Sequence, residues 1–103
     1  MTISICLIVK DESLFLEQCL SSIKDLADEI IVAVDSRTSD STREIAKKFT
    51  QNVFDFEWKQ DYSYARNLAM EKATKEWIFF IDGDEMIAKE DIENIKNLTA
   101  SND

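Results

Sequence analysis

The chain of 103 residues contains no histidine and no proline, and it has only one glycine and two cysteines. Histidine is absent and Cys6 and Cys19 lack Cys-x-x-Cys spacing, so a zinc site of the usual type is excluded. Both cysteines lie in apolar patterns, which predicts buried free thiols. No apolar run approaches the roughly 20 residues that span a bilayer. The N-terminus also lacks a signal-peptide pattern, so we expect a cytoplasmic protein without a membrane span.

Acidic side chains outnumber basic ones. Asp and Glu number 21 against 12 Lys and Arg, which gives a formal net charge of −9. Such a surface repels nucleic acid and anionic lipid, and neither is expected as a main partner. It attracts cations, and an anionic ligand would need such a cation or a local Arg or Lys. The apolar content of 45% predicts a packed globule, which we expect to be a single domain over residues 1–103.

Four apolar runs alternate with four helical patterns along the chain. The runs cover residues 3–9, 29–34, 52–56 and 76–81, and the helical patterns cover 12–26, 41–49, 62–75 and 89–98. This alternation is typical of an α/β fold in which right-handed helical crossovers join parallel strands. We expect a Rossmann-like sheet of about four strands in the order 3-2-1-4, with helices on both faces. Ser41 and Glu44 have capping-box spacing, which predicts a helix that starts at Ser41.

Charged residues follow three of the predicted strands directly. Residues 10–12 (Lys-Asp-Glu) leave the first strand, Asp35 leaves the second, and residues 82–85 (Asp-Gly-Asp-Glu) leave the fourth. Doubly wound sheets bind ligands beyond the carboxyl ends of their strands, at the point where the strand order reverses. With the order 3-2-1-4, that crevice opens between the first and fourth strands. The predicted topology therefore gathers these residues at one edge of the sheet.

Asp82 and Asp84 are two residues apart, so both side chains point the same way in extended chain. Two carboxylates about 4 Å apart repel by roughly 4 kcal/mol at an effective dielectric constant of 20. Mg²⁺ or Mn²⁺ would offset this repulsion and bridge to ligand phosphates. Gly83, between them, would let a bulky ligand approach the backbone. An Asp-Gly hairpin turn is the alternative. A calcium loop of EF-hand type is excluded, because Met86 and Ile87 occupy positions for an oxygen ligand and a glycine.

Three further side chains each have two interpretations. Arg66 lies early in its helix, where the helix dipole disfavours a cation, so it binds phosphate or pairs with a surface carboxylate. Asp35, at the end of a buried strand, is a ligand contact or a loop carboxylate. Lys10 contacts a phosphate or base, or neutralises its acidic neighbours. Trp58 and Trp77 are interpreted as packing residues.

The sequence resembles the donor-binding half of glycosyltransferase family 2, which has the GT-A fold. The resemblance covers about residues 3–88 and rests on three stretches in this order: ISICLIVKDESLFLEQCLSSI, DEIIVAVDSRTSDSTREIAKKF and FEWKQDYSYARNLAMEKATKEWIFFIDGDEMI. It implies metal-dependent binding of a nucleotide sugar, most commonly UDP-linked, and inverting transfer of the sugar to an acceptor.

The resemblance also implies roles for individual residues. The D-x-D motif maps onto Asp82 and Asp84, which would bind Mn²⁺ or Mg²⁺ and through it the diphosphate. Nucleotide-sugar contacts map onto Val9, Lys10, Asp11, Asp35, Arg66, Asp82 and Gly83. The catalytic base of the family belongs to an acceptor-binding half, and Glu85, beside the metal motif, is the nearest candidate in this chain.

Two departures from the family pattern stand out. Glycine is usual at three loop positions that hold Arg37, Gln51 or Asn52, and Lys75 here. The chain also ends soon after the metal motif, so we expect a minimal or truncated member, with slow donor hydrolysis as its activity if it lacks a base. A non-catalytic nucleotide-sugar-binding module that needs a partner is one alternative. A receiver domain with Asp55 as phosphoacceptor is another, although it requires a fifth strand. The sequence identifies no acceptor and leaves a homo-oligomer open.

Overall fold

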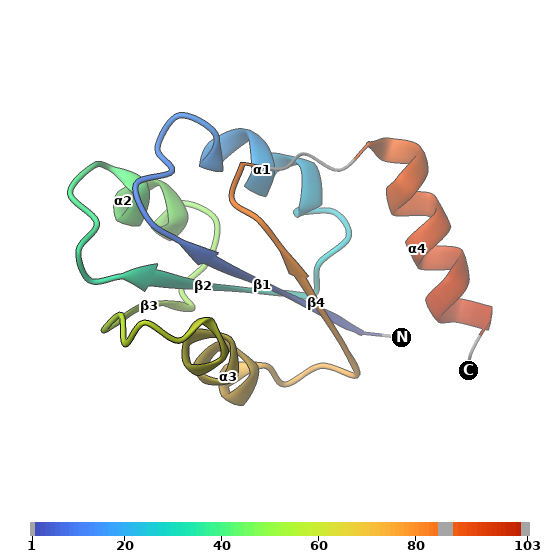
Figure 1. Cartoon of the computed structure of the whole chain (residues 1–103). Helices are drawn as coiled ribbons and strands as arrows, with labels where there is room; N and C mark the ends of the chain where they lie inside the picture. The colour runs from blue at the N-terminus through green and yellow to red at the C-terminus, as the bar shows by residue number, and fades with distance from the viewer. Residues whose placement is uncertain (1, 85–87, 102–103) are drawn as a thin grey trace.

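The computed structural model describes residues 2–84 and 88–101. Within these ranges, four strands form one parallel sheet in the order β3-β2-β1-β4, and helices alternate with them along the chain (Figure 1). The predicted α/β class and strand order are therefore confirmed. The elements are β1 (Ile3–Val9), α1 (Leu16–Ile23), β2 (Glu29–Asp35), α2 (Thr42–Lys47), β3 (Val53–Phe56), α3 (Tyr62–Lys72), β4 (Trp77–Ile81) and α4 (Lys89–Ser101).

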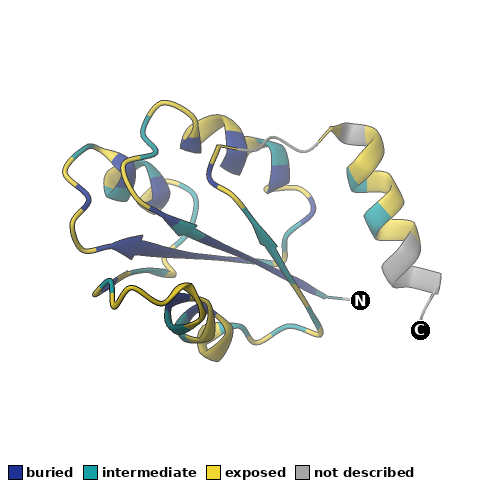
Figure 2. Cartoon of the chain, in the orientation of Figure 1, coloured by how far each residue is buried: buried dark blue, intermediate teal, exposed yellow. Residues whose placement is uncertain are grey.

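The two central strands, β1 and β2, are buried on both faces (Figure 2). Side chains alternate between the faces of a strand, so neighbouring residues of β1 pack against different helices. Leu7 joins the cluster that contains Leu20 of α1 and Ala46 of α2. Cys6 packs on the other face against Ala69 of α3. Figure 1 shows this arrangement, with α1 and α2 on one side of the sheet and α3 on the other.

The last helix, α4, stands apart from the other helices at one side of the sheet in Figure 1. Ile92 and Ile95 are three residues apart on this helix. Both are partly buried and pack against the large cluster that β1 and α1 share. The amphipathic spacing of α4 thus attaches it to the main core.

The start of α2 differs from the capping box expected at Ser41 and Glu44. Ser41 precedes the helix, but its side chain makes no capping hydrogen bond. The Asp40 carboxylate instead accepts hydrogen bonds from the amide of Thr42, at 2.9 Å, and from the Thr42 hydroxyl. Asp is a strong competitor for first-turn amides because its carboxylate bonds the backbone two residues ahead. The prediction of a capping box was therefore wrong.

The hairpin alternative for the Asp-Gly pair is also wrong. β4 pairs in parallel with β1, in a register that runs from Ile3 opposite Trp77 to Leu7 opposite Ile81. Among the described residues that follow Asp84, the one regular element is the helix α4. A hairpin would need an antiparallel returning strand.

Both cysteines are buried and free, as predicted. Burial in the apolar interior, with a smaller contribution from the charge of Glu29, raises the pKa of the Cys6 thiol to about 11. In the described part of the chain, no helix is long and apolar enough to cross a membrane.

Candidate functional site

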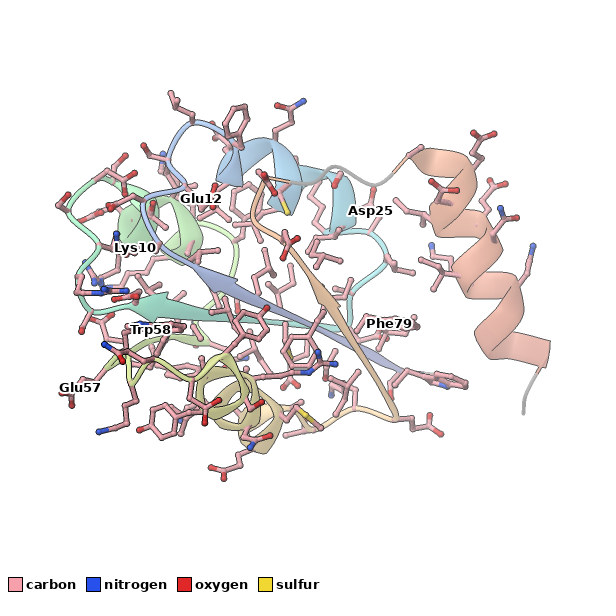
Figure 3. All side chains as sticks on the ribbon, viewed as in Figure 1. Lys10, Glu12, Asp25, Glu57, Trp58 and Phe79 are labelled. Atoms are coloured by element: carbon pink, nitrogen blue, oxygen red, sulfur yellow. The ribbon has the colours of Figure 1, made fainter. Side chains whose placement is uncertain are left out.

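A pocket of about 290 Å³ opens at the carboxyl ends of β1 and β2. Figure 3 shows Lys10, Glu12 and Trp58 gathered at this end of the sheet, with Asp25 and Phe79 at the far side. The sequence predicted a ligand crevice between the first and fourth strands, β1 and β4. The pocket instead extends from β1 across β2 to the segment after β3. It is lined by Ile8, Val9, Lys10, Glu12, Asp35, Arg37, Phe56, Trp58 and Tyr62.

Asp35 and Arg37 form the most developed polar contact in the pocket wall. The Arg37 backbone amide and Nε donate to Oδ1 of Asp35 at 2.9 and 3.0 Å, and Nη2 donates to Oδ2 at 2.7 Å. These hydrogen bonds from the Arg37 side chain hold the pKa of the Asp35 carboxyl below its ordinary value, and they raise the pKa of Arg37. Asp35 therefore remains ionised at the end of β2 although it is buried.

Trp58 lines the pocket beside Arg37, just after β3. It packs against the cluster formed by Ala33, Phe56 and Ala65, and Cζ of Arg37 lies 5.7 Å from the centroid of its ring. The sequence-based interpretation of Trp58 as a packing residue was incomplete, because it both packs and lines the pocket. Trp58 follows Phe56, the buried last residue of β3, by two positions. This spacing was the sequence signal that could have placed it at the carboxyl edge of the sheet.

Lys10 and Asp11 both follow β1 directly, but only Lys10 lines the pocket. Lys10 lines the pocket, and its Nζ is 3.6 Å from Oδ2 of Asp11. Asp11 has a positive φ of 50°, and its Oδ1 accepts hydrogen bonds from the amides of Ser39 and Asp40 at 2.8 and 3.3 Å. The Ser39 amide makes the largest contribution to lowering the pKa of the Asp11 carboxyl. Asp11 thus fastens the loop after β2 and does not belong to the pocket lining.

Two more contacts join the loops that follow β1 and β2. The Thr42 hydroxyl accepts a hydrogen bond from the amide of Glu12 at 2.7 Å. The Asp40 carboxylate accepts one from the amide of Ser13 at 3.1 Å. Loops that are tied to each other in this way hold Lys10 and Glu12 in place at the mouth of the pocket.

The Asp82–Asp84 segment lies beside Glu12. Asp82 and Asp84 are exposed, and Gly83 between them is buried. The pKa of the Glu12 carboxyl is raised, mainly by burial and further by the charges of Asp84 and Asp82. Glu12 also lines the pocket, so it connects the pocket with the acidic pair.

Gly83 has a packing role that was not expected. Its φ is not positive, and a Cβ atom at this position would lie 2.8 Å from Cγ1 of Val9. The space beside the glycine is therefore filled by a side chain of β1. This contact gives Gly83 a packing role, and the approach of a ligand to its backbone stays a prediction.

The donor chemistry of Asp82 and Asp84 suits a hard divalent cation, because both offer exposed carboxylate oxygens. Among residues 2–84 and 88–101, no group of three or more His, Cys, Asp or Glu side chains is arranged to hold a metal ion. The pair would therefore supply part of a coordination sphere, and phosphate and water oxygens would complete it. Mg²⁺ is commonly held in this way, by one or two carboxylates together with substrate phosphates.

Three other sequence candidates lie away from the pocket or outside the described residues. Arg66 is exposed on α3, and its Cζ lies 4.4 Å from the centroid of the Phe80 ring. This cation–π contact was in neither of the two sequence-based interpretations of Arg66. Asp55, the phosphoacceptor of the receiver alternative, is paired with Arg43 at 2.8 Å. Glu85, the candidate base, lies outside the described residues.

The sequence was compared with known families and proteins. The model of glycosyl transferase family 2 matches residues 4–102. The SPbeta prophage-derived glycosyltransferase SunS of Bacillus subtilis is 47% identical over 91 residues, which are 86% of this chain and 21% of that protein. An uncharacterised glycosyltransferase of Rickettsia conorii is 34% identical over 99 residues, which are 96% of this chain and 34% of that protein. The chain therefore spans about a fifth to a third of the length of these relatives.

Solved structures agree on the fold. Residues 1–349 of TarS from S. aureus superpose with a TM-score of 0.73 at 22% identity, covering 98% of this chain and 33% of that one. The complex of the same protein with UDP-GlcNAc gives a TM-score of 0.71. This likeness shows the shared GT-A fold. Because the family model matches nearly the whole chain, this protein belongs to glycosyl transferase family 2.

Proposed function

We propose that this chain binds a nucleotide sugar, a UDP-linked one in particular, and that it serves the transfer of that sugar to an acceptor. One observation carries the proposal: the pocket at the carboxyl ends of β1 and β2 adjoins, through Glu12, the acidic pair Asp82 and Asp84. A base-sized apolar recess beside a candidate metal site is the arrangement that a nucleoside diphosphate requires. The family match supports this proposal, as does a structural neighbour that was crystallised with UDP-GlcNAc.

The pocket wall suits a nucleoside. Ile8, Phe56 and Trp58 provide apolar and aromatic surface on which a flat base can lie. The Asp35–Arg37 pair provides directed polar groups, and Lys10 provides a positive charge at the mouth. This mixture of apolar lining and few polar groups is typical of small-molecule sites.

The acidic pair Asp82 and Asp84 explains how an acidic protein could hold a negatively charged diphosphate. A diphosphate is repelled by a chain of net charge −9, and Lys10 alone offsets little of that. Asp82 and Asp84 would hold Mn²⁺ or Mg²⁺, which, when bound, supplies positive charge to the diphosphate leaving group. The residues of this chain would then orient the donor, with the base in the pocket and the diphosphate toward the acidic pair.

Transfer needs a base for the acceptor group, and Glu85 remains the candidate within this chain. Inverting transfer is the outcome that the family resemblance implies. A second candidate function is a donor-binding module that requires further chain or a partner for transfer. The chain spans about a fifth to a third of the length of these curated relatives. Incubating the protein with a UDP-sugar and Mn²⁺ and measuring the UDP released separates the two functions. An enzyme releases UDP, whereas a binding module holds the donor without turnover.

Calorimetry with UDP and UDP-GlcNAc, with and without Mn²⁺, tests donor binding. We expect Mn²⁺-dependent binding by the wild type and weaker binding by Asp84→Asn. The loss should be on the order of tenfold or more, because even residues that only orient metal ligands contribute about 10- to 100-fold. Asp25→Asn is the matched control. It removes the same charge from an exposed site that lies away from Lys10, Glu12 and Trp58 (Figure 3).

The outcomes separate the parts of this proposal. Equal binding with and without Mn²⁺, or an unchanged Asp84→Asn, would contradict the metal role of the acidic pair. Absence of UDP binding by the wild type would contradict the donor function as a whole.

A further inference from the structure

Asp35 and Arg37 are paired, yet their side chains are very differently exposed, at 4% for Asp35 and 55% for Arg37. Arg37 donates three hydrogen bonds to the Asp35 carboxylate, from its backbone amide, Nε and Nη2. A carboxylate offers about four lone-pair positions. Arg37 therefore uses most of the hydrogen-bonding capacity of Asp35, and little of the Asp35 side chain is left exposed in the pocket wall.

The guanidinium group of Arg37 is in the opposite situation. It carries five N–H donors in a fixed plane, and the contacts with Asp35 involve Nε and Nη2 and leave Nη1 out. Arg37 lines the pocket, and its Cζ lies 5.7 Å from the centroid of the Trp58 ring. The contacts with Asp35 and Trp58 thus hold the guanidinium group of Arg37 in place, half-exposed, with Nη1 outside the contacts with Asp35.

We propose that Arg37, rather than Asp35, is the side chain that hydrogen-bonds the base of the nucleotide, and that Asp35 is a positioning residue for the guanidinium. This assignment rests on the proposed function. The aromatic wall beside Arg37 suits a flat base, and the acceptor would be a carbonyl oxygen of that base, as uracil provides. Charge-assisted hydrogen bonds of this kind are stronger than neutral ones, which makes Arg37 a determinant of base recognition.

Calorimetric titration of UDP in the presence of Mn²⁺ tests the assignment on the wild type, Arg37→Gln, Arg37→Lys, Asp35→Asn and the Asp35→Asn/Arg37→Gln double variant. We expect Arg37→Gln to weaken UDP binding by about 10- to 100-fold, the effect of losing a charge-assisted hydrogen bond. Arg37→Lys keeps the charge but lacks the planar fork, so it should recover part of the affinity. Asp35→Asn should weaken binding in the wild type and have no further effect in Arg37→Gln, because a positioning residue acts through its partner.

Arg43→Gln is the matched control. Arg43 makes the same two-point contact with Asp55, at 2.8 and 3.0 Å, and is not part of the pocket lining. It removes the same charge, so a general electrostatic effect would appear equally in both variants. Inorganic pyrophosphate with Mn²⁺ is the second control. Its binding should be the same for the wild type and Arg37→Gln if Arg37 contacts the base.

Three results would overturn the assignment while leaving donor binding in place. These are equal UDP affinity of Arg37→Gln and Arg43→Gln, an equal effect of Asp35→Asn in both backgrounds, and a parallel loss of pyrophosphate binding. Absence of UDP binding by the wild type would instead overturn the proposed function, and this assignment with it.

Discussion

A Cβ atom on Gly83 would lie 2.8 Å from Cγ1 of Val9, and 3.3 Å from Cγ of Glu12. The single glycine of the sequence therefore stands where the segment after β4 passes directly over the end of β1. Val9 is buried in the main core, so the close approach is set by packing. It also brings Asp82 and Asp84 into the neighbourhood of Glu12.

Gly83→Ala should destabilise the protein by about 1–3 kcal/mol, the usual range for overpacking a well-packed site. Val9 is β-branched and buried, so its side chain has little freedom to move away. Urea unfolding of the wild type, Gly83→Ala, Val9→Ala and the double variant measures the effect. The double variant should lose less stability than the sum of the two single variants, because Val9→Ala removes the clash. Additive losses would show that the contact with Val9 is not the cause.

Thr42→Val should cost roughly 1–3 kcal/mol in the free energy of unfolding, because it leaves the amide of Glu12 without its acceptor. Thr42 is fully buried, and its hydroxyl links that amide to the Asp40 carboxylate. Ser41→Ala is the control, since Ser41 makes no capping hydrogen bond. Its effect should stay within about 0.5 kcal/mol. A loss of about 1 kcal/mol for Ser41→Ala, the usual cost of removing a capping side chain, would restore the capping-box interpretation.

The stability of the fold should decrease in acid, and Asp40 should contribute to that decrease. Hydrogen bonds from the Thr42 hydroxyl, and then from backbone amides, hold the pKa of the Asp40 carboxyl well below its ordinary value of 3.8. The unfolded chain therefore takes up the proton first. The stabilisation is complete above about pH 4 and is lost as the pH falls toward the folded-state pKa.

Urea unfolding of the wild type and Asp40→Asn at a series of pH values between about 7 and 2 measures this contribution. Asp40→Asn should be less stable at neutral pH, and its free energy of unfolding should fall less steeply below about pH 4. The free energy of unfolding of both proteins should still depend on pH in this range through Asp11, because the pKa of the Asp11 carboxyl is lowered as well. Parallel curves for the two proteins would contradict the role given to Asp40.

Trp58→Leu should weaken UDP binding, because it removes an aromatic surface from the pocket. Stacking of a base on an aromatic side chain contributes about 1–3 kcal/mol, and Leu retains part of the apolar contact. Trp77→Leu is the control. Trp77 stacks on Phe79 with a centroid distance of 6.4 Å and packs against the main core. Calorimetry on both variants should show a loss of UDP affinity for Trp58→Leu alone, and equal affinities would place the base elsewhere.

Much of the fold could be predicted because its signals are local. The run from Ile3 to Val9 is nearly continuous in apolar residues and contains several β-branched ones, and the structure forms β1 over those same residues. The helix predicted over residues 12–26 is shorter, Leu16–Ile23, because residues 10–15 form the loop that carries Lys10, Asp11 and Glu12. Amide groups in that loop bond Thr42 and Asp40, which are about thirty positions further along the chain.

The candidate site was predicted in part. Val9, Lys10 and Asp35 line the pocket as expected for residues at strand ends. Arg37 and Trp58 were not expected there. Arg37 was visible in the sequence as a departure from a family glycine. Its contact with Asp35 is local, two residues back, but its approach to Trp58 depends on how the loop after β2 folds against the segment after β3.

Periodicity and short motifs were enough to predict the order of strands and helices, the gathering of acidic residues at strand ends, and membership of the family. Which partners the polar groups take became visible only in the folded structure. Asp11 fastens the loop after β2, Arg37 covers the carboxylate of Asp35, and Gly83 makes room for Val9. The contacts of Asp11 and Gly83 join segments far apart in the chain, whose relative position is set by packing of the sheet. Arg37 and Asp35 are only two residues apart, and their contact becomes part of the pocket wall because the loop after β2 lies beside Trp58.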